Sequence, residues 1–430
     1  MFHLGWFYGF QVQSWNGTWS GSDGATEWMT PDMFVEAAQA MERAGFDCMV
    51  IEDALFVQDI YKGSAEFTLS NAFMAPKHDP MPYVPVMAAG TKHLGFIPTV
   101  TTSFYPPFLA ARLLSTLDHV TGGRVGANLV MSHNDRTAQN FGLDGQAEHD
   151  HRYEMGDEWV ELVNRLWGSW EPDALVLDEE AHVYADHTKV SRVDFEGSFY
   201  RSRGPLNTAP SPQGRPVLCQ AGGSPRGRDF AARNADILLS NVQGIEAMKE
   251  YRDDIRARAA AFGRDPDDIK IVFLVSPVLG ATDAEATRRW DRMVAATEQN
   301  LEANLAFLSY YSGIDYSTLD LDAPIPHLST NASRSTIAHT KEQSAGQTLR
   351  EYASHPVRSC VELIGSPDTV AERMGEVAEE VGGDGFLISL PLTRRTIAEV
   401  TDGLAPALRA RGLIRDGYPH ATLRETLKEF

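Results

Sequence analysis

The chain has 430 residues, of which 43% are hydrophobic and 23% are charged, so it is long enough to bury a large core. Its 59 acidic and 38 basic residues give a formal net charge of -21, and the resulting surface field repels polyanions. We therefore expect no nucleic-acid partner.

Three cysteines, Cys48, Cys219 and Cys360, lie far apart, and no CxxC pair or Cys/His cluster has the spacing of metal ligands. The opening sequence, MFHLGWFYGF, lacks the basic leader of an export signal, and no stretch approaches about 18 apolar residues. The sequence therefore predicts a reduced, cytoplasmic protein with no metal site and no membrane partner.

The first complete helix signal runs from Thr30 to Gly45. Thr30 is the expected N-cap, Pro31 suits the first turn and Gly45 supplies the stop. A short apolar run at 47–51 follows directly and predicts a buried strand. A helix followed at once by a strand is typical of βαβ units.

The same alternation continues along the chain. Further strands are predicted at 3–8, 94–99, 124–131, 216–221, 235–240, 270–278 and 385–390, which makes eight in all. Helices are predicted between most of them, at 107–119, 149–167, 225–234, 244–262, 284–305, 366–381 and 397–411. Eight strands with intervening helices favour an α/β fold of the closed (β/α)8 TIM barrel type over an open sheet.

Two stretches, 170–210 and 306–350, are rich in polar and turn residues and do not fit this repeat. We interpret both as insertions, so that residues 1–430 form a single barrel domain. The second stretch contains Tyr310 and Tyr311 ahead of a Ser/Thr-rich run. It predicts either a lid or pocket wall, or a surface loop ordered by packing or by a subunit interface.

Polar residues stand at the expected carboxyl ends of the strands, namely Asp53, Thr99, Asn128 and Ser132. In a parallel barrel the reactive groups gather at this end. Each residue alone could simply be a hydrogen-bonding loop residue. Their joint occurrence predicts a functional site.

His149 and Tyr153 stand four residues apart on one face of a long predicted helix, where such a pair can hold a phosphate or ribityl chain. The segment Gly222–Arg228 follows a predicted strand. Its glycines permit close backbone approach, Ser224 can cap the next helix, and an arginine adds compensating charge. We expect an anion cradle here; simple packing and an ordinary capped helix are the alternatives.

No GxGxxG, GxxxxGK[ST] or GxSxG motif is present, and no Ser/His/Asp or Cys/His arrangement suggests covalent catalysis. Ligand-holding strand ends without bond-cleaving groups favour a cofactor as the source of reactivity. Four tryptophans crowd the first strand and the following loop, where they either wall an aromatic pocket or pack in the core: Trp6, Trp15, Trp19 and Trp28.

A set of short motifs runs in a fixed order along nearly the whole chain. They are Phe46-Asp47 through Asp53, Ile97-Pro98-Thr99, Tyr105-Pro106-Pro107, Leu117-Asp118, Gly123-Arg124, Asn140-Phe141-Gly142, His149 to Tyr153, Leu166-Trp167-Gly168-Ser169-Trp170, Gly204-Pro205-Leu206, Ser211-Pro212-Gln213-Gly214, Gln220-Ala221-Gly222 with Ser224, Gly365-Ser366-Pro367, Asp384-Gly385-Phe386 and Thr422-Leu423-Arg424-Glu425. In this order they resemble the bacterial luciferase-like flavin monooxygenases, in particular the nitrilotriacetate and dibenzothiophene-sulfone monooxygenase branch.

The resemblance implies an enzyme that takes FMN reduced by a separate NAD(P)H:FMN oxidoreductase and uses O2 to oxidise a small organic substrate. It implies flavin contacts at Asp53, Thr99, Asn128, His149, Tyr153 and Ser224, with Thr99 and Asn128 as the catalytic pair beside the flavin ring. It also implies a homo-oligomer, either a dimer or a tetramer.

Two positions depart from the branch, because Ala127 stands where relatives often have tryptophan and Met131-Ser132 where they have Thr-Ser. Both changes would reshape the surroundings of the ring, so the substrate is less determined than the cofactor. An aromatic or heteroatom-bearing substrate is favoured over a polyaminocarboxylate, because no extra basic cluster is assigned to carboxylate recognition.

Three other functions fit the same sequence pattern. The first is an F420-dependent hydride-transfer oxidoreductase of the same superfamily, which needs no oxygen. The second is a non-catalytic flavin-binding protein, and the third is a barrel hydrolase without a cofactor.

Overall fold

In the computed structural model, which describes residues 1–12, 19, 25–355 and 359–430, the chain forms a closed barrel of eight parallel strands. Around the barrel the order is β1 (His3–Gly9), β14 (Gly385–Ile388), β11 (Lys270–Val275), β10 (Ile237–Ser240), β9 (Val217–Gln220), β4 (Gly126–Val130), β3 (Gly95–Thr101) and β2 (Cys48–Glu52). Every strand overlaps a predicted range, and the predicted (β/α)8 TIM barrel is confirmed.

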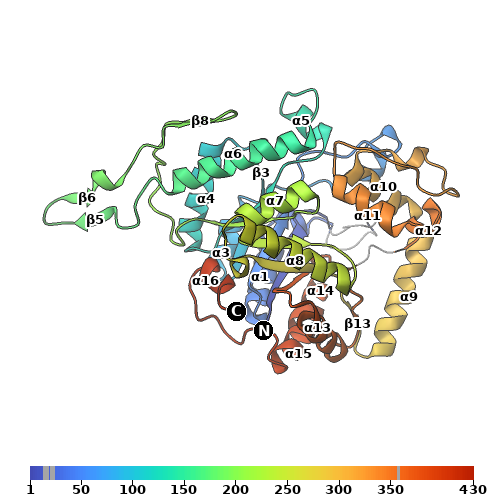
Figure 1. Ribbon diagram of the computed structural model, residues 1–430. Coiled ribbons are helices and arrows are strands. Elements are labelled where there is room, and N and C mark those ends of the chain that lie inside the picture. The colour runs from blue at the N-terminus through green and yellow to red at the C-terminus, as the bar shows by residue number, and fades with distance from the viewer. Residues whose placement is uncertain (13–18, 20–24, 356–358) are drawn as a thin grey trace.

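Helices pack around the outside of the barrel (Figure 1). The longer ones are α1 (Asp32–Ala44), α4 (Pro107–Thr121), α6 (His149–Trp167), α7 (Pro225–Asn234), α8 (Ile245–Ala261), α9 (Asp283–Gln299), α10 (Leu301–Ser312), α11 (Arg334–Gln343) and α13 (Pro367–Val381). The shorter ones are α2 (Glu66–Ser70), α3 (Tyr83–Ala89), α5 (Asp135–Asn140), α12 (Leu349–Ala353), α14 (Arg394–Ala398), α15 (Ala405–Ala410) and α16 (Leu423–Leu427).

Side-chain capping explains which helix boundaries were predictable. Helices α6 and α7 begin and end at the predicted residues, and their first turns are capped by the side chains of Glu148 and Ser224. The predicted cap Thr30 is wrong, because its hydroxyl donates to the Glu27 carbonyl and α1 begins two residues later.

Two predicted helices are interrupted. The range 284–305 contains α9 and the start of α10, separated by Asn300, whose φ of -120° and ψ of 59° lie outside the helical region. The range 397–411 contains a π-helical turn, Glu399–Leu404, between α14 and α15.

The two predicted insertions lie outside the strands of the barrel. The segment 170–210 carries two hairpins that extend away beside α4 and α6 (Figure 1), β5 (Leu175–Asp178) with β6 (Val183–Ala185), and β7 (Phe195–Glu196) with β8 (Arg201–Ser202). The segment 306–350 includes the end of α10 and all of α11, and packs against Tyr61 and Phe73 of the chain after β2. The assignment of residues 1–430 to a single domain stays a prediction.

A short pair of strands, β12 (Val278–Leu279) and β13 (Ile364–Gly365), lies outside the barrel.

The barrel interior is filled by apolar side chains that include Val50, Ile97, Val217 and Leu387. Leu423 and Leu427 of α16 belong to the same cluster. A Cβ on Gly95, the first residue of β3, would lie 2.4 Å from Leu423, so the glycine makes room for α16. Helix α16 therefore closes the amino-terminal end of the barrel and leaves the carboxyl end for a ligand.

The amino-terminal end also holds a buried cluster of charges centred on Asp47. Its carboxylate accepts hydrogen bonds from the Leu4 backbone N–H at 2.9 Å and from Arg415 Nε at 2.8 Å, and lies 3.3 Å from His3 Nδ1. Burial alone would raise the pKa of Asp47, but His3 and Arg415 outweigh it and hold the pKa below its ordinary value. Arg415 also pairs with Glu429, and so ties the C-terminal segment to β1 and β2.

Replacing Arg415 with alanine would leave a buried carboxylate without its main cation, and we expect the free energy of unfolding to fall by about 3–5 kcal/mol. Urea denaturation at pH 7 measures the change. Because the folded pKa of Asp47 is lowered, this stabilisation is complete above about pH 4 and declines as the pH falls further. The exposed pair of Arg395 with Glu399 supplies a control, since Arg395→Ala should cost no more than about 1 kcal/mol. An equal loss in the free energy of unfolding of the two variants would contradict the stabilising role of the buried Arg415–Asp47 pair.

Candidate functional site

The carboxyl end of the barrel, called the mouth below, carries the predicted catalytic pair. Glu52, Thr99 and Asn128 continue the inward-facing rows of β2, β3 and β4. Thr99 and Asn128 are neighbours in the parallel register of β3 and β4. The Thr99 hydroxyl donates to the Ile51 carbonyl at 2.7 Å, and Asn128 Nδ2 donates to Thr99 Oγ1 at 2.9 Å.

This hydrogen-bond chain fixes the orientation of the Asn128 amide. Because the single hydroxyl proton of Thr99 is used on Ile51, Thr99 can only accept from Asn128, whose nitrogen must therefore face it. Asn128 Oδ1 is buried and has no hydrogen-bond partner among the described residues. Leaving such an oxygen unpaired costs about 1–3 kcal/mol, so it is well placed to accept a hydrogen bond from a ligand.

Asp53 follows β2 directly, and its Oδ1 accepts a hydrogen bond from the Ala54 N–H at 2.8 Å. Burial and the neighbouring Glu52 raise the pKa of Asp53 to about 7, although Lys77 opposes them. Near neutral pH a large share of the Asp53 carboxyls is therefore protonated and able to donate a hydrogen bond.

The sequence did not reveal Lys77 as a site residue. Its ammonium group forms an ion pair with Glu52, and both side chains are largely buried. The loop that carries Lys77 is held to the barrel by a β-bridge to Gln11. No local sequence motif indicates Lys77, because its partner Glu52 lies 25 residues earlier in the chain.

At the end of β9, the first turn of α7 is built from Ser224 and its glycines. Ser224 Oγ accepts a hydrogen bond from the Gly227 N–H at 3.0 Å. A Cβ on Gly227 would lie 2.8 Å from the Tyr153 hydroxyl, so the glycine allows Tyr153 to approach the turn. The His149 and Tyr153 rings pack with their centroids 5.2 Å apart. The structure thus brings His149, Tyr153 and Ser224 together.

The two arginines of this turn do not supply free positive charge. Arg226 forms an ion pair with Asp157 at 2.5 Å, and Arg228 with Asp254 at 2.9 Å. The groups available to an anion are instead hydroxyls and the backbone N–H groups of the helix start.

The two groups of predicted residues share the mouth. Leu129 of β4 pairs in register with Gln220 of β9, which connects the Asn128 strand to the α7 turn. Burial raises the pKa of the Tyr153 hydroxyl, and hydrogen bonds with Ser224 and Gln220 partly offset this. All six predicted contact residues therefore lie at the carboxyl end of the barrel in two clusters, one at the ends of β2, β3 and β4 and the other at the starts of α6 and α7.

Helix α10, from the second insertion, adds aromatic residues to this end. The ring of Tyr311 stacks on His133 with centroids 5.9 Å apart and planes 10° apart, and Tyr310 stacks on Phe56 at 5.2 Å. Burial and the charge of Glu52 raise the pKa values of both tyrosines. Both tyrosines are therefore part of the packing at this end of the barrel, and the lid or pocket wall stays a prediction.

His133, in the loop after β4, is held uncharged. Burial lowers its pKa to about 4, and the nearby Arg152 contributes to the shift. Its Nε2 is buried and lacks a hydrogen-bond partner within the described parts of the chain. A neutral imidazole nitrogen without a partner can exchange a hydrogen bond with a ligand at neutral pH.

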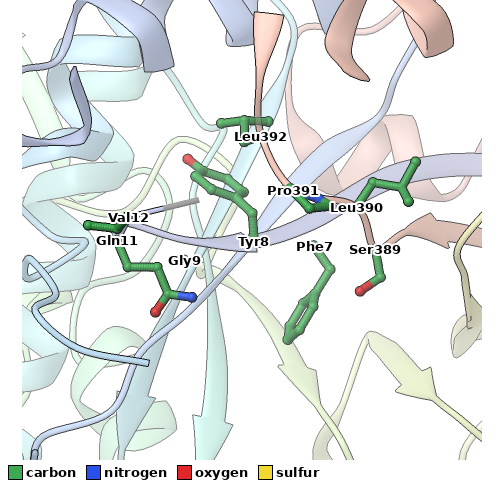
Figure 2. A pocket seen from close by; sticks show the side chains of 9 residues that line it. All are labelled: Phe7, Tyr8, Gly9, Gln11, Val12, Ser389, Leu390, Pro391 and Leu392. Carbon is green, nitrogen blue, oxygen red and sulfur yellow. The ribbon is translucent and has the colours of Figure 1, made fainter. Parts of the chain in front are cut away.

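A pocket lies at the mouth where β1 and β14 end. It is lined by Phe7, Tyr8, Gly9, Gln11, Val12, Ser389, Leu390, Pro391 and Leu392, which belong to β1 and the segment after it and to the segment after β14 (Figure 2). Its cavity volume is only about 10 Å³, which is room for about one water molecule and far below the size of a site for an organic ligand.

The predicted tryptophan wall does not form in the described residues. Trp6 is buried outside the strand barrel, where its Nε1 donates to the Leu390 carbonyl at 3.2 Å. Trp28 is buried and donates to Ala25, while Trp19 is exposed. Trp15 lies outside the described residues. Trp6 and Trp28 are therefore packing residues, and Trp19 is a surface residue.

Within residues 1–12, 19, 25–355 and 359–430, no group of three His, Cys, Asp or Glu side chains is arranged to hold a metal ion. In the same part of the chain, no helix combines the length and the apolar character needed to cross a membrane.

The raised pKa of Asp53 predicts a pH-dependent stability. An unfolded aspartate ionises near pH 3.9, whereas the folded one ionises near pH 7, so the folded state binds the proton more tightly. We expect the free energy of unfolding of the wild type to fall relative to that of Asp53→Asn as the pH rises from 4 to 7. Urea denaturation at several pH values measures this, with the exposed Asp144→Asn as a control for loss of charge. Parallel curves for the wild type and Asp53→Asn would contradict the prediction.

Comparison with known proteins identifies relatives along the whole chain. The sequence profile described as "Luciferase-like monooxygenase" matches residues 2–385. The dimethyl-sulfide monooxygenase of Hyphomicrobium sulfonivorans is 36% identical over 96% of this chain and 86% of its own length. The dibenzothiophene-sulfone monooxygenase of Rhodococcus erythropolis strain XP is 36% identical over 99% of this chain and 96% of its own. The crystal structure of the riboflavin lyase RcaE, with modified FMN and riboflavin, has a TM-score of 0.90 and 32% identity over 100% of this chain and 96% of that one.

Proposed function

We propose that this chain, which belongs to the luciferase-like monooxygenase family, is the oxygenase component of a two-component system that uses reduced FMN and O2 to oxidise a small organic substrate. The family assignment confirms the resemblance found in the sequence. The observation that carries the proposal is the Asn128–Thr99–Ile51 hydrogen-bond chain at the mouth, because it presents one buried amide oxygen to a ligand.

The residues at the mouth fit FMN at both ends of the molecule. The phosphate would lie at the start of α7, where Ser224, Tyr153 and backbone N–H groups can donate to it and the helix dipole favours an anion. The flavin ring carries N–H donors, which suit the unpaired Asn128 Oδ1. Asp53 and His149 would complete the contacts. When bound, reduced FMN supplies the electrons for the reaction with O2.

The protein's own contribution is orientation, polarity and exclusion of water. Thr99 and Asn128 would hold the ring edge, because their positions are fixed by the backbone of β2. Tyr310 and Tyr311 would cover the mouth with aromatic surface. The partly protonated Asp53 would donate a hydrogen bond to the ligand near neutral pH.

A separate NAD(P)H:FMN oxidoreductase would supply the reduced FMN. This is supported by the absence of a GxGxxG dinucleotide fingerprint from the sequence. We further propose that the protein forms a homo-oligomer, either a dimer or a tetramer. We also propose a cytoplasmic location, which the three free, buried cysteines support.

The decisive experiment mixes the purified protein with reduced FMN and O2 in the presence of aryl sulfides and aryl sulfones. Mass spectrometry then follows a gain of sixteen mass units or loss of a heteroatom group. Product formation that requires both FMN and O2 supports the proposal. Anaerobic reduction of F420 would contradict the proposed oxygenase and indicate an F420-dependent hydride-transfer enzyme. Tight FMN binding without any turnover would indicate a non-catalytic flavin-binding protein.

Ser224→Ala tests the phosphate end of the site. We expect the Kd for FMN, measured by fluorescence quenching, to rise at least fivefold, while the Kd for riboflavin, which has no phosphate, changes little. Ser366→Ala is a matched control, because Ser366 also caps a helix whose first residue is proline. Each substitution should cost about 1 kcal/mol of stability through loss of the cap. Equal effects on FMN and riboflavin would argue against a phosphate at α7.

Asn128→Ala tests the ring end of the site. Loss of the amide should increase the hydrogen peroxide released per reduced FMN consumed severalfold, because the oxygen reaction is no longer directed to substrate. A peroxide assay alongside O2 uptake measures this coupling. Asn234→Ala, at the far end of α7, is the control. Unchanged coupling in Asn128→Ala would refute the role of Asn128.

A further inference from the structure

The outer hairpin of the first insertion is not covered by the rest of the described chain. Every residue from 176 to 184, which covers most of β5, the turn and most of β6, is exposed. This segment, called the arm tip below, projects away from the barrel (Figure 1). Its large apolar side chains are Val176, Leu177, Val183 and Tyr184, and Tyr184 is 69% exposed. A two-stranded hairpin alone is at best marginally stable in water, so the arm tip would gain stability from a surface to pack on.

The base of the same insertion, by contrast, is anchored to α6. The Glu158 carboxylate accepts hydrogen bonds from the backbone N–H groups of residues 198–200 at 2.7–2.8 Å. Trp170 Nε1 donates to the Leu206 carbonyl at 2.8 Å, which joins the two ends of the insertion. These contacts fix the direction in which the arm tip leaves the barrel. A tip held in this way loses less freedom when it binds a partner.

Helix α4 carries a second exposed apolar surface. Leu109, Leu113, Thr116 and Val120 are spaced three or four residues apart and therefore share one face of the helix, called the α4 face below. Leu109 is 52% exposed and Val120 is 59% exposed, and the neighbouring Phe108 is also exposed. The outward face of a surface helix is normally polar. An apolar outward face indicates contact with another molecule.

The insertion and α4 are neighbours in the structure. Trp167 Nε1, just before the insertion, donates to the Ala111 carbonyl at 3.0 Å, and Thr208 Oγ1, near its end, donates to Ser115 Oγ at 2.9 Å. The arm tip and the α4 face are both exposed, so they do not cover one another within one chain. A two-fold axis beside α4 would place the arm tip of each copy on the α4 face of the other, and this reciprocal contact closes a dimer.

The charges of the two surfaces are complementary. The arm tip carries three consecutive acidic side chains, Asp178, Glu179 and Glu180, all of them exposed. Arg112 is exposed beside the α4 face, and its guanidinium forms no ion pair with any residue that the structure describes. Because the whole chain has a formal net charge of -21, most of its surface repels an acidic segment. The α4 face instead offers a cation, which favours this orientation of the two copies.

We propose that the arm tip of each copy packs on the α4 face of a second copy of this chain, with Glu179 and Glu180 beside Arg112 of the partner subunit. The apolar side chains of the arm tip cover Leu109 and Val120, and both surfaces leave water together. The inference rests on the homo-oligomer proposed above and names the two surfaces that form it.

Replacing residues 176–184 with Asn-Gly tests the arm tip. Asn-Gly favours a tight two-residue turn, which would close the hairpin at the paired residues Leu175 and Ala185. We expect the dissociation constant of the oligomer, measured by analytical ultracentrifugation of the purified protein, to rise at least tenfold, because central apolar contacts dominate interface affinity. Circular dichroism establishes that the variant is folded. An unchanged dissociation constant in the folded variant would overturn the inference.

Charge reversal tests the pairing of the two surfaces. Glu179→Lys with Glu180→Lys on the arm tip, and Arg112→Glu on α4, should each weaken association severalfold, and the three substitutions together should restore most of it. Glu379→Lys with Glu380→Lys on α13 is the control, because it changes the net charge equally. Both lysine pairs lower the net negative charge, so general repulsion alone would strengthen association in both. Failure of the triple variant to recover affinity would overturn the pairing with Arg112.

The outcome is separable from that of the proposed function. Neither FMN nor O2 takes part in the ultracentrifugation, so a failure of flavin-dependent turnover leaves the inference intact. An oligomer that persists without the arm tip would overturn the inference and leave the proposed homo-oligomer standing. A wild-type protein that sediments as a monomer would overturn both, and would assign the arm tip to a different protein partner.

Discussion

Everything at the mouth depends on the closure of the barrel at β1. This strand pairs with β2 on one side and with β14 on the other, so residues near the two ends of the chain become neighbours. Because neighbouring strands are parallel all round the barrel, their carboxyl ends lie at one mouth, and α16 fills the opposite end with Leu423 and Leu427. The small pocket between Gly9 and Leu390 exists only because β1 and β14 meet. An open sheet that left β1 and β14 unpaired would lose this junction.

The two ends of the barrel treat a buried carboxylate in opposite ways. At the amino-terminal end, Asp47 is surrounded by cationic and N–H donors, its pKa is lowered, and the group stabilises the fold. At the mouth, Asp53 is left with Glu52 as its neighbour and its pKa is raised to about 7. Burial is common to both, so the difference comes from the partners. A buried carboxyl with a raised pKa lowers the free energy of unfolding when it ionises near neutral pH. Its protonated form can nevertheless donate a hydrogen bond to a ligand, and groups with such shifted pKa values are common at functional sites.

Local sequence signals predicted the helices and strands and the polar residues at the strand ends and at the start of α7. The site residues that these signals missed are brought there by contacts between distant parts of the chain. The apolar runs mark all eight strands because buried parallel strands need apolar side chains on both faces. Side-chain caps such as Ser224 made α7 predictable to the residue. Lys77, by contrast, reaches Glu52 through a loop with no motif, and His133 meets Tyr311 only because an insertion folds back over the mouth. The break at Asn300 and the separate surroundings of Trp6, Trp19 and Trp28 have the same origin, because periodicity and composition do not show which face of an element meets another.

The residues at the mouth are held to the barrel in two different ways. Thr99 and Asn128 are bonded to one another and to the backbone of β2, and the first turn of α7 is fixed by its own cap, so this side is as rigid as the barrel itself. The small pocket is built instead from the end of β1 and from the segments that follow β1 and β14, and α10 contributes aromatic packing to the same end of the barrel. Changes in these loops and in α10 can alter the surface at the mouth without moving Thr99, Asn128 or the first turn of α7. A barrel of this kind can therefore keep the geometry of its strand ends while the surrounding loops vary, because the two depend on different parts of the chain.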